Sequence, residues 1–553
     1  MSTTFSMNRT LCFALLLWMI PAAVAAEPAP VADGTQPMPG ETVFIPELRG
    51  VITVPDAAAV SELVPAGFSG IDTSRTPLLS DPAAAELIRQ FLNKPMSFGS
   101  LDRLCIGLRT WLRLMGQPFV NVHAPPQEVS AGVIRLVVQR SKLDGELKIE
   151  GATYFSEASY RSATALAPGA EIDAVAITDA VNWLGENPYR RATVVAEPGA
   201  TAGTTRLTLR VLEERPWRLT AGYSNSGTPV TDENRVSASV AWGNAFGRGD
   251  QLGYTFSTDP EMERSRSHSA NYTMLFRSRR SLTIYGAHAE IESELPAPLT
   301  QQGRSWQAGA RFSMPLKTVN EWKQSLALTA DFKASDNNLE FATIPITDNL
   351  THIAQFGATW SLSRSSETLR GSLAASVFAS PGGLTGRNHG RYFDVSRAGA
   401  KADYVYGQLQ GQIGRALPLG FSWSTSALFQ VASGPLLGTE QLNGGGVYGV
   451  RGFRESTAFG DEGVVVNNEL HLPAFSPFKR RDQADVFVFV DAAALRDLGV
   501  GGDSVELASA GIGLNYQVRR HFTLRASYGW QLKELPNVSG GNSHGHVAAT
   551  IAF

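Results

Sequence analysis

The chain has 553 residues, of which 43% are hydrophobic and 18% charged, and its formal net charge is -3. This composition argues against long disordered segments, and the lack of any run of about 18 apolar residues after the N-terminus argues against a bundle of membrane helices. The slightly acidic balance provides no basic surface for nucleic acid, and two cysteines, Cys12 and Cys105, are too few for a disulfide framework.

The N-terminus has the pattern of an export signal. Arg9 precedes an apolar stretch at residues 11–20, and Ala23-Val24-Ala25 forms a small-x-small cleavage site. The stretch is too short to span a bilayer comfortably, so a signal peptide over residues 1–25 is favoured over a membrane anchor. Residues 26–41, rich in Pro and Ala, are then expected to be a linker. The mature chain is expected to act outside the cytoplasm, where no ATP is available.

Residues 42–140 are predicted to form a first α/β module with a strand, two helices and two further strands. Asp81-Pro82 is an N-cap followed by Pro at the first helical position, and apolar residues repeat with helical spacing over 84–92 and 101–115. Cys105 lies on the apolar stripe of the second helix, which predicts a buried, unreactive thiol. Residues 57–80 interrupt the module as an insertion to which the pattern assigns no role.

Residues 141–215 repeat this order as a second module. Helices are predicted over 157–165 and 173–185, the second of them ended by Asn187-Pro188, and strands over 192–196 and 205–212. A module of this kind leaves one edge of its sheet open, to which an extended partner can add a strand. The alternative is that the two modules are spacers that bind nothing.

Residues 216–553 are predicted to form a barrel. Roughly sixteen segments of about ten residues alternate between apolar and polar side chains, as outer-membrane barrels do. Arg525, for example, lies on the polar face of a segment whose apolar face carries Tyr528 and Trp530. The chain ends in Phe553 on the apolar face of the last strand, which must pair with the first because lipid tolerates no open sheet edge. The predicted fold class is therefore α+β periplasmic modules followed by a transmembrane antiparallel β-barrel of about 16 strands.

A long connection over residues 435–463 lies between the eleventh and twelfth segments and contains Val450-Arg451-Gly452-Phe453. Alternation in the next two segments directs Glu469, Phe489 and Asp491 into the lumen. Two inward carboxylates need a cation, which Arg451 can supply. The alternative is a surface loop with an exposed arginine and two solvated acids.

These features together resemble the two-partner secretion translocators, the haemolysin and filamentous-haemagglutinin secretion/activation proteins of the barrel-assembly superfamily. The specific residues are Val450-Arg451-Gly452-Phe453 and Phe489-x-Asp491, and Asn187-Pro188-Tyr189-Arg190 is also similar. The modules then resemble polypeptide-transport-associated (POTRA) domains. The resemblance implies that the loop folds into the lumen and that Arg451 pairs with Asp491. Because alternation also directs Glu469 inward, we expect it to be a second acceptor. In a partly wet lumen such a pair is worth about 1 to 3 kcal/mol.

The resemblance also implies partners and a location. It places the chain in the outer membrane of a Gram-negative bacterium, in contact with outer-membrane lipids, with its modules in the periplasm. The modules are expected to capture one large unfolded exoprotein through an N-terminal secretion domain, and the barrel to secrete it. Phe553 looks like the C-terminal signal that the barrel-assembly machinery reads during biogenesis. Two alternatives stay open: a barrel-assembly insertase, which usually carries more modules, and a passive porin, which needs no arginine matched to a lumen acid.

The sequence shows two departures from the family pattern and no sign of catalysis. Ala493 stands where the family usually has Gly, and residues 26–41 are too short and too rich in Pro for the helix that plugs many relatives. Gly-x-Ser-x-Gly, Walker and Cys-x-x-Cys motifs do not occur, so neither enzyme activity nor a cofactor is expected. His544 and His546 without a third ligand are poor evidence for a metal.

Overall fold

The computed structural model describes residues 42–65, 67–201, 203–276, 279–293, 299–341, 344–345, 349–478, 481–533, 535 and 542–553. The signal peptide and linker predicted over residues 1–41 lie outside the described residues. The chain divides into two units, Met1–Gln139 and Arg140–Phe553, which are described separately below. Among the helices of the described ranges, none is both long and apolar enough to span a bilayer.

The first unit is built on a four-stranded sheet with the order β3-β2-β6-β5. Its strands are β2 (Gly50–Val54), β3 (Gly70–Asp72), β5 (Val120–His123) and β6 (Val133–Arg140). The central strand β2 is parallel to both β3 and β6. A separate short ladder joins β1 (Val43–Ile45) to β4 (Met96–Ser97). Strand β5 is therefore one edge of the sheet, and β3 is the other.

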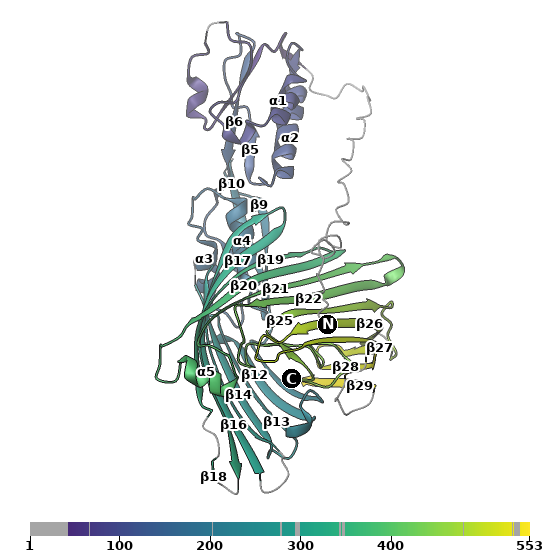
Figure 1. Ribbon diagram of the computed structural model, residues 1–553. Coiled ribbons are helices and arrows are strands. Elements are labelled where there is room, and N and C mark those ends of the chain that lie inside the picture. Colours follow the sequence, from purple (N-terminus) through teal and green to yellow (C-terminus); the bar gives the residue numbers. More distant parts are fainter. Residues whose placement is uncertain are drawn as a thin grey trace, which may run out of the picture. The chain divides into compact units, whose positions relative to one another are not determined.

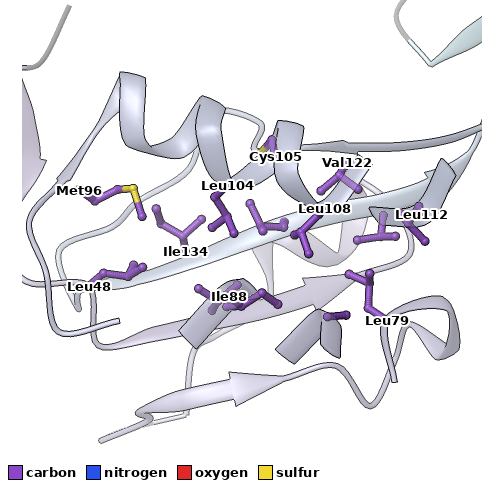
Figure 2. Close-up of a cluster of buried hydrophobic side chains, with 14 of the residues drawn as sticks. Leu48, Leu79, Ile88, Met96, Leu104, Cys105, Leu108, Leu112, Val122 and Ile134 are labelled. Carbon is purple, nitrogen blue, oxygen red and sulfur yellow. The ribbon is translucent and has the colours of Figure 1, made fainter. Parts of the chain in front are cut away.

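Two helices, α1 (Pro82–Arg89) and α2 (Phe98–Leu114), pack on one face of this sheet. The Asp81 side chain caps α1 by accepting a hydrogen bond from the Ala83 N–H at 2.8 Å, and Ser97 forms a capping box at the start of α2. Figure 2 shows the apolar cluster between the helices and the sheet, which includes Leu104, Leu108 and Cys105. Burial raises the pKa of the Cys105 thiol to about 11.

The insertion at residues 57–80 has a structural role that its sequence did not reveal. It supplies β3, which covers the edge of β2, and the short turns η1 (Ala58–Ser61) and η2 (Pro77–Leu79). Val60 packs with Val133 and Val137 on the sheet face opposite the helices. The Arg135 guanidinium donates to the Val60 carbonyl at 2.9 Å and fixes the insertion to β6. One edge and one face of the first module are thereby closed.

The second module opens the second unit and has the predicted element order. Its elements are β7 (Lys142–Leu143), β8 (Lys148–Glu150), α3 (Glu157–Thr164), α4 (Ala174–Leu184), β9 (Arg190–Pro198) and β10 (Thr204–Glu213). Strand β10 is parallel to β7 and β8 on one side and antiparallel to β9 on the other. Strand β9 is thus an edge strand of this sheet.

The turn after α4 attaches the second module to the barrel. Asn187 is fully buried and donates from Nδ2 to the carbonyls of Gly243 and Gly249, at 2.5 and 3.2 Å. The Tyr189 ring packs directly on Gly243 and leaves no room there for a Cβ. Arg279 of the barrel forms an ion pair of 2.6 Å with Asp179 of α4. The Asn187-Pro188 motif, which was predicted to end α4, is therefore also part of the contact between the second module and the barrel.

Sixteen antiparallel strands of the described residues close into a barrel, and the predicted fold class is confirmed (Figure 1). These strands are β11 (Trp217–Ser224), β12 (Arg235–Ala245), β13 (Asp250–Thr258), β14 (Ser265–Leu275), β15 (Ser281–Ser293), β16 (Leu299–Val319), β17 (Trp322–Phe341), β19 (Thr351–Ser365), β20 (Leu369–Pro381), β21 (Asp403–Ala416), β22 (Ser422–Ala432), β25 (Glu462–His471), β26 (Asp482–Arg496), β27 (Ser504–Val518), β28 (Phe522–Gln531) and β29 (Ser543–Ala552). Strand β11 pairs with β29, so the first and last strands leave no open edge.

Two features of the barrel were not predicted. Strands β16 and β17 have 21 and 20 residues instead of about ten, because their hairpin continues well beyond the apolar band of about 25 Å that a barrel presents to lipid. A short helix, α5 (Gly390–Ser396), lies between β20 and β21 and buries Phe393. The two-residue strand β18 (Ile344–Pro345) pairs with the end of β17.

Candidate functional site

The connection between β22 and β25, residues 433–461, folds into the barrel lumen. It forms a small ladder of its own between β23 (Leu442–Asn443) and β24 (Phe459–Gly460). Val450 and Phe453 of the predicted motif are 0% and 1% exposed, because both pack against the inner wall of the barrel. Because β22 ends at Ala432 and β25 begins at Glu462, the loop starts and ends two residues earlier than the predicted range of 435–463.

Strand alternation in β26 supplies the wall that this loop meets. Val488 and Val490 are exposed on the outer face, whereas Phe487, Phe489 and Asp491 are buried on the inner face. Period-two geometry requires this division, because successive side chains of a strand point to opposite faces. Asp491 is thus held at a fixed height inside the barrel.

Arg451 and Asp491 form a buried pair with three hydrogen bonds. The guanidinium donates from Nε to Oδ2 at 2.7 Å and from Nη2 to Oδ1 at 2.8 Å, and the backbone N–H of Arg451 donates to Oδ2 at 3.1 Å. The side chains are 3% and 0% exposed. A bidentate guanidinium fixes both the position and the direction of the loop. The pair is thus more deeply buried than the partly wet pair that the sequence led us to expect.

Glu469 of β25 connects Arg451 to further charged groups. Its Oε1 accepts hydrogen bonds from both Arg451 and Arg525. Its Oε2 lies 3.0 Å from Nε2 of His471, whose Nδ1 lies 2.8 Å from Asp485. The structure thus brings the three predicted ionic residues of the lumen together. Arg525 was not predicted as a partner, although its alternation already placed it on the polar face.

Aromatic rings and glycines complete the seat of the guanidinium. The Arg451 guanidinium carbon lies 3.8 Å from the centre of the Phe489 ring, within the range of a cation–π contact. Gly511 and Gly513 of β27 leave the space that the Phe489 and Phe487 rings occupy, where any Cβ would collide. The cation is therefore enclosed by carboxylates and by ring faces.

The remaining residues of the motif fix the backbone of the loop. Gly452 has φ +89° and lies against Gly529 of β28, so a side chain at either position would meet the other backbone. Gln531 donates to the Gly452 carbonyl at 2.8 Å. Val450 and Phe453 pack into an apolar cluster that contains Ala493. The alanine that departs from the family pattern is thus part of this cluster.

The base of the loop has a second set of buried anchors. Asp461 is fully buried and pairs with Arg397, next to α5, through two hydrogen bonds of 2.6 and 2.7 Å. Its carboxylate also accepts hydrogen bonds from the backbone N–H groups of Leu436 and Leu498, at 2.8 and 2.7 Å. Glu440 pairs with Lys333 of β17 at 2.5 Å and accepts a hydrogen bond from Tyr406 at 2.8 Å.

These anchors were not predicted from the sequence. Glu440 and Asp461 lie in a loop without periodicity, and their cations are 107 and 64 residues away. Nothing local distinguishes them from the acids of an ordinary surface loop. At the lumen site, in contrast, two local signals exist: the alternation that directs Glu469 and Asp491 inward, and the motif that contains Arg451.

Three other residues singled out from the sequence, His544, His546 and Phe553, lie on β29 or directly after it. Phe553 follows this strand and donates from its N–H to the Leu219 carbonyl at 2.9 Å, and its side chain is exposed on the outside. The rings of His544 and His546 meet edge to face, with their centres 4.8 Å apart. The described residues bring no third ligand to them, nor any other cluster of three metal-binding side chains.

Comparisons of the sequence with known families give two matches. The family described as Haemolysin secretion/activation protein ShlB/FhaC/HecB matches residues 203–516. The POTRA domain of the ShlB type matches residues 68–140. Together the two matches cover parts of both the first module and the barrel.

Individual proteins resemble the chain over about half of its length or more. The heme/hemopexin transporter protein HuxB of Haemophilus influenzae (strain 86-028NP) is 20% identical over 505 residues, which are 86% of this chain and 84% of that protein. The hemolysin transporter protein ShlB of Serratia marcescens is 24% identical over 282 residues, 49% of each chain. The solved structure of CdiB from Escherichia coli has a TM-score of 0.75 at 16% identity and covers 95% of this chain and 94% of that one. The structural likeness supports the fold.

Proposed function

Because the chain belongs to the haemolysin secretion/activation protein (ShlB/FhaC/HecB) family, we propose that it captures an unfolded exoprotein in the periplasm and secretes it through its barrel. It is an outer-membrane protein transporter of the two-partner secretion type, with its POTRA domains in the periplasm. The observation that carries the mechanism is the buried Arg451, which joins a lumen loop to Asp491 and Glu469.

Capture is proposed to occur by strand addition to the open edges of the two modules, residues 42–140 and 141–215. In the first module the sheet ends at β5, because β3 already covers the edge of β2. In the second module β9 pairs with β10 along its whole length. No other strand of the described residues pairs with β9, so β9 is an edge of this sheet. Main-chain pairing at such an edge accepts many sequences, and the neighbouring pockets provide the choice of partner.

Passage is proposed to depend on movement of the lumen loop. Residues 433–461 occupy the inside of the barrel and are anchored at the tip by Arg451 and at the base by Glu440 and Asp461. An exoprotein can cross only when the loop yields part of the lumen. Ion pairs suit a loop that must dock and release, because they fix one geometry while they are formed. When they separate, the charged side chains can be solvated by water. Without periplasmic ATP, folding of the exoprotein outside the cell supplies the driving force.

Biogenesis is proposed to follow the route of other outer-membrane barrels. Residues 1–25 direct export, residues 216–553 form the barrel in contact with lipid, and the barrel-assembly machinery reads Phe553. The exposed position of Phe553 at the end of the closing strand supports this role, because the ring is accessible from outside the barrel.

Deletion of residues 41–140 tests the capture step. The first module is a separate compact unit, so the barrel of the truncated protein should still assemble, as its heat-dependent migration on a gel would show. Export of a co-expressed exoprotein that carries an N-terminal secretion domain should be lost. Undiminished export by a correctly assembled, truncated barrel would rule out capture by this module.

A further inference from the structure

The tip of the lumen loop, residues 444–450, is a closed and rigid turn. The Val450 N–H donates to the Gly444 carbonyl at 2.8 Å, and the Gly449 N–H donates to the Gly446 carbonyl at 3.1 Å. The carboxylate of Glu455 accepts the N–H of Val447 at 2.7 Å and lies beneath the turn. Three hydrogen bonds therefore hold a segment of seven residues in one conformation.

The glycines of the tip leave room for few side chains. A Cβ would fall 2.5 Å from the Leu495 side chain at Gly444, and 2.6 Å from a neighbouring carbonyl at Gly449. At Gly445 it would fall 2.7 Å from the Arg454 carbonyl, and Gly446 has φ +99°. The glycine run accordingly serves to fold this turn, and Val447 and Tyr448 are the side chains that the turn presents.

Tyr448 projects from this turn into open space. Its side chain is 93% exposed, whereas Val450 and Arg451 a few residues on are 0% and 2% exposed. The carbonyl of the next residue, Gly449, accepts a hydrogen bond of 2.6 Å from Asn467, which pairs with Asp491 across the inner wall. The turn that carries the ring is thus hydrogen-bonded to the inner wall of the barrel, beside the buried arginine, and leaves the ring exposed.

We propose that Tyr448 is a contact site for the polypeptide in transit, an inference that rests on the proposed function. An aromatic face offers apolar and edge-to-face contacts to passing Leu, Phe, Tyr or Trp side chains without requiring a particular sequence. A turn held in one conformation strengthens such a contact, because the ring loses little conformational entropy when a polypeptide binds to it. The ligand class is an unfolded polypeptide segment that carries apolar or aromatic side chains.

Peptide block of single channels tests this site in the full-length protein. A short unfolded peptide of Gly and Ser with spaced Leu and Tyr is added to the protein in a planar bilayer, with an all Gly and Ser peptide as reference. Tyr448→Ala should shorten the blocked time of the first peptide about two- to tenfold, the range of an aromatic contact. Tyr448→Phe should retain the block because the ring face is kept, and Val447→Ala in the same turn should leave it unchanged.

The outcomes separate this inference from the proposed function. If neither peptide enters the pore of any variant, the proposed function fails and the inference falls with it. If the peptide blocks every variant for equal times, the pore transports polypeptide but Tyr448 does not contact it. A photoreactive phenylalanine at position 448 that crosslinks to the added peptide supports the site. Crosslinks confined to the protein's own chain, with or without peptide, would overturn it.

Discussion

Replacement of Arg451 by alanine should release the lumen loop without unfolding the barrel. Asp491 would then be left without a cation, because Arg451 supplies all of its hydrogen bonds from charged groups among the described residues. Glu469 would keep Arg525 and His471 as partners. The loss of hydrogen bonds therefore falls mainly on the buried carboxylate of Asp491.

The expected magnitude follows from burial. With side chains 3% and 0% exposed, removal of one partner of the pair should cost about 3 to 5 kcal/mol, and not the roughly 1 to 3 kcal/mol of a partly wet pair. The equilibrium between docked and undocked loop should then shift by about a hundredfold to a few thousandfold. The ladders of the barrel do not involve Arg451, so assembly in the membrane should be unchanged.

Thiol labelling measures this shift. Cys105 is replaced by Ser, and Val450, which is 0% exposed, by Cys. The rate of maleimide labelling then reports the undocked fraction of the loop. Arg451→Ala in this background should raise the rate within the stated range and reduce export. The double variant with Asp491→Ala should label more slowly than Arg451→Ala alone, because no carboxylate remains buried without a partner.

Two results would refute the reasoning. Strictly additive effects of Arg451→Ala and Asp491→Ala would show that the two side chains do not act as a pair. An unchanged labelling rate in Arg451→Ala would show that the apolar cluster and the base anchors hold the loop without the ion pair. Arg451→Lys provides the matched control, because it keeps the charge but cannot bind two carboxylates in a fixed geometry.

Three further predictions concern the loop and the first module. Deletion of residues 433–461 should raise single-channel conductance and abolish export, and unchanged conductance would mean that the loop does not obstruct the pore. Arg397 pairs not only with the buried Asp461 but also with Asp497, whose side chain is 38% exposed. Arg397→Ala should increase spontaneous openings of the channel because it leaves Asp461 buried without its cation, whereas Asp497→Ala should have little effect. Cys105 should resist alkylation in the folded module until the pH approaches about 11. Because its folded pKa lies above the unfolded value of 9.0, it contributes stability that is lost as the pH rises from about 9 to 11, which urea unfolding at graded pH measures.

The sequence alone determined most of the helices and strands and the faces of the barrel strands. Helix α1 begins where Asp81 and Pro82 predict, and α4 ends just before Asn187-Pro188, because caps and proline act within one turn of the chain. The inward position of Asp491 and the closure by a final strand follow from period two and from the absence of water in lipid. The assignment to two-partner secretion translocators and to the outer membrane is confirmed by the family match.

The tertiary structure alone decided the partners of the buried charges and the use of the insertion. Arg397 meets Asp497 across 100 residues and Lys333 meets Glu440 across 107, distances over which no sequence period persists. The insertion covers one edge of β2 through β3, whereas β6 pairs with the other edge of β2, and both partners come from distant parts of the chain. Burial of the Arg451 pair, too, depends on how the loop, β25 and β26 exclude water once the barrel has closed. Local patterns specify the direction of a side chain, but its neighbours and its exposure are set by segments that folding brings together from distant parts of the chain.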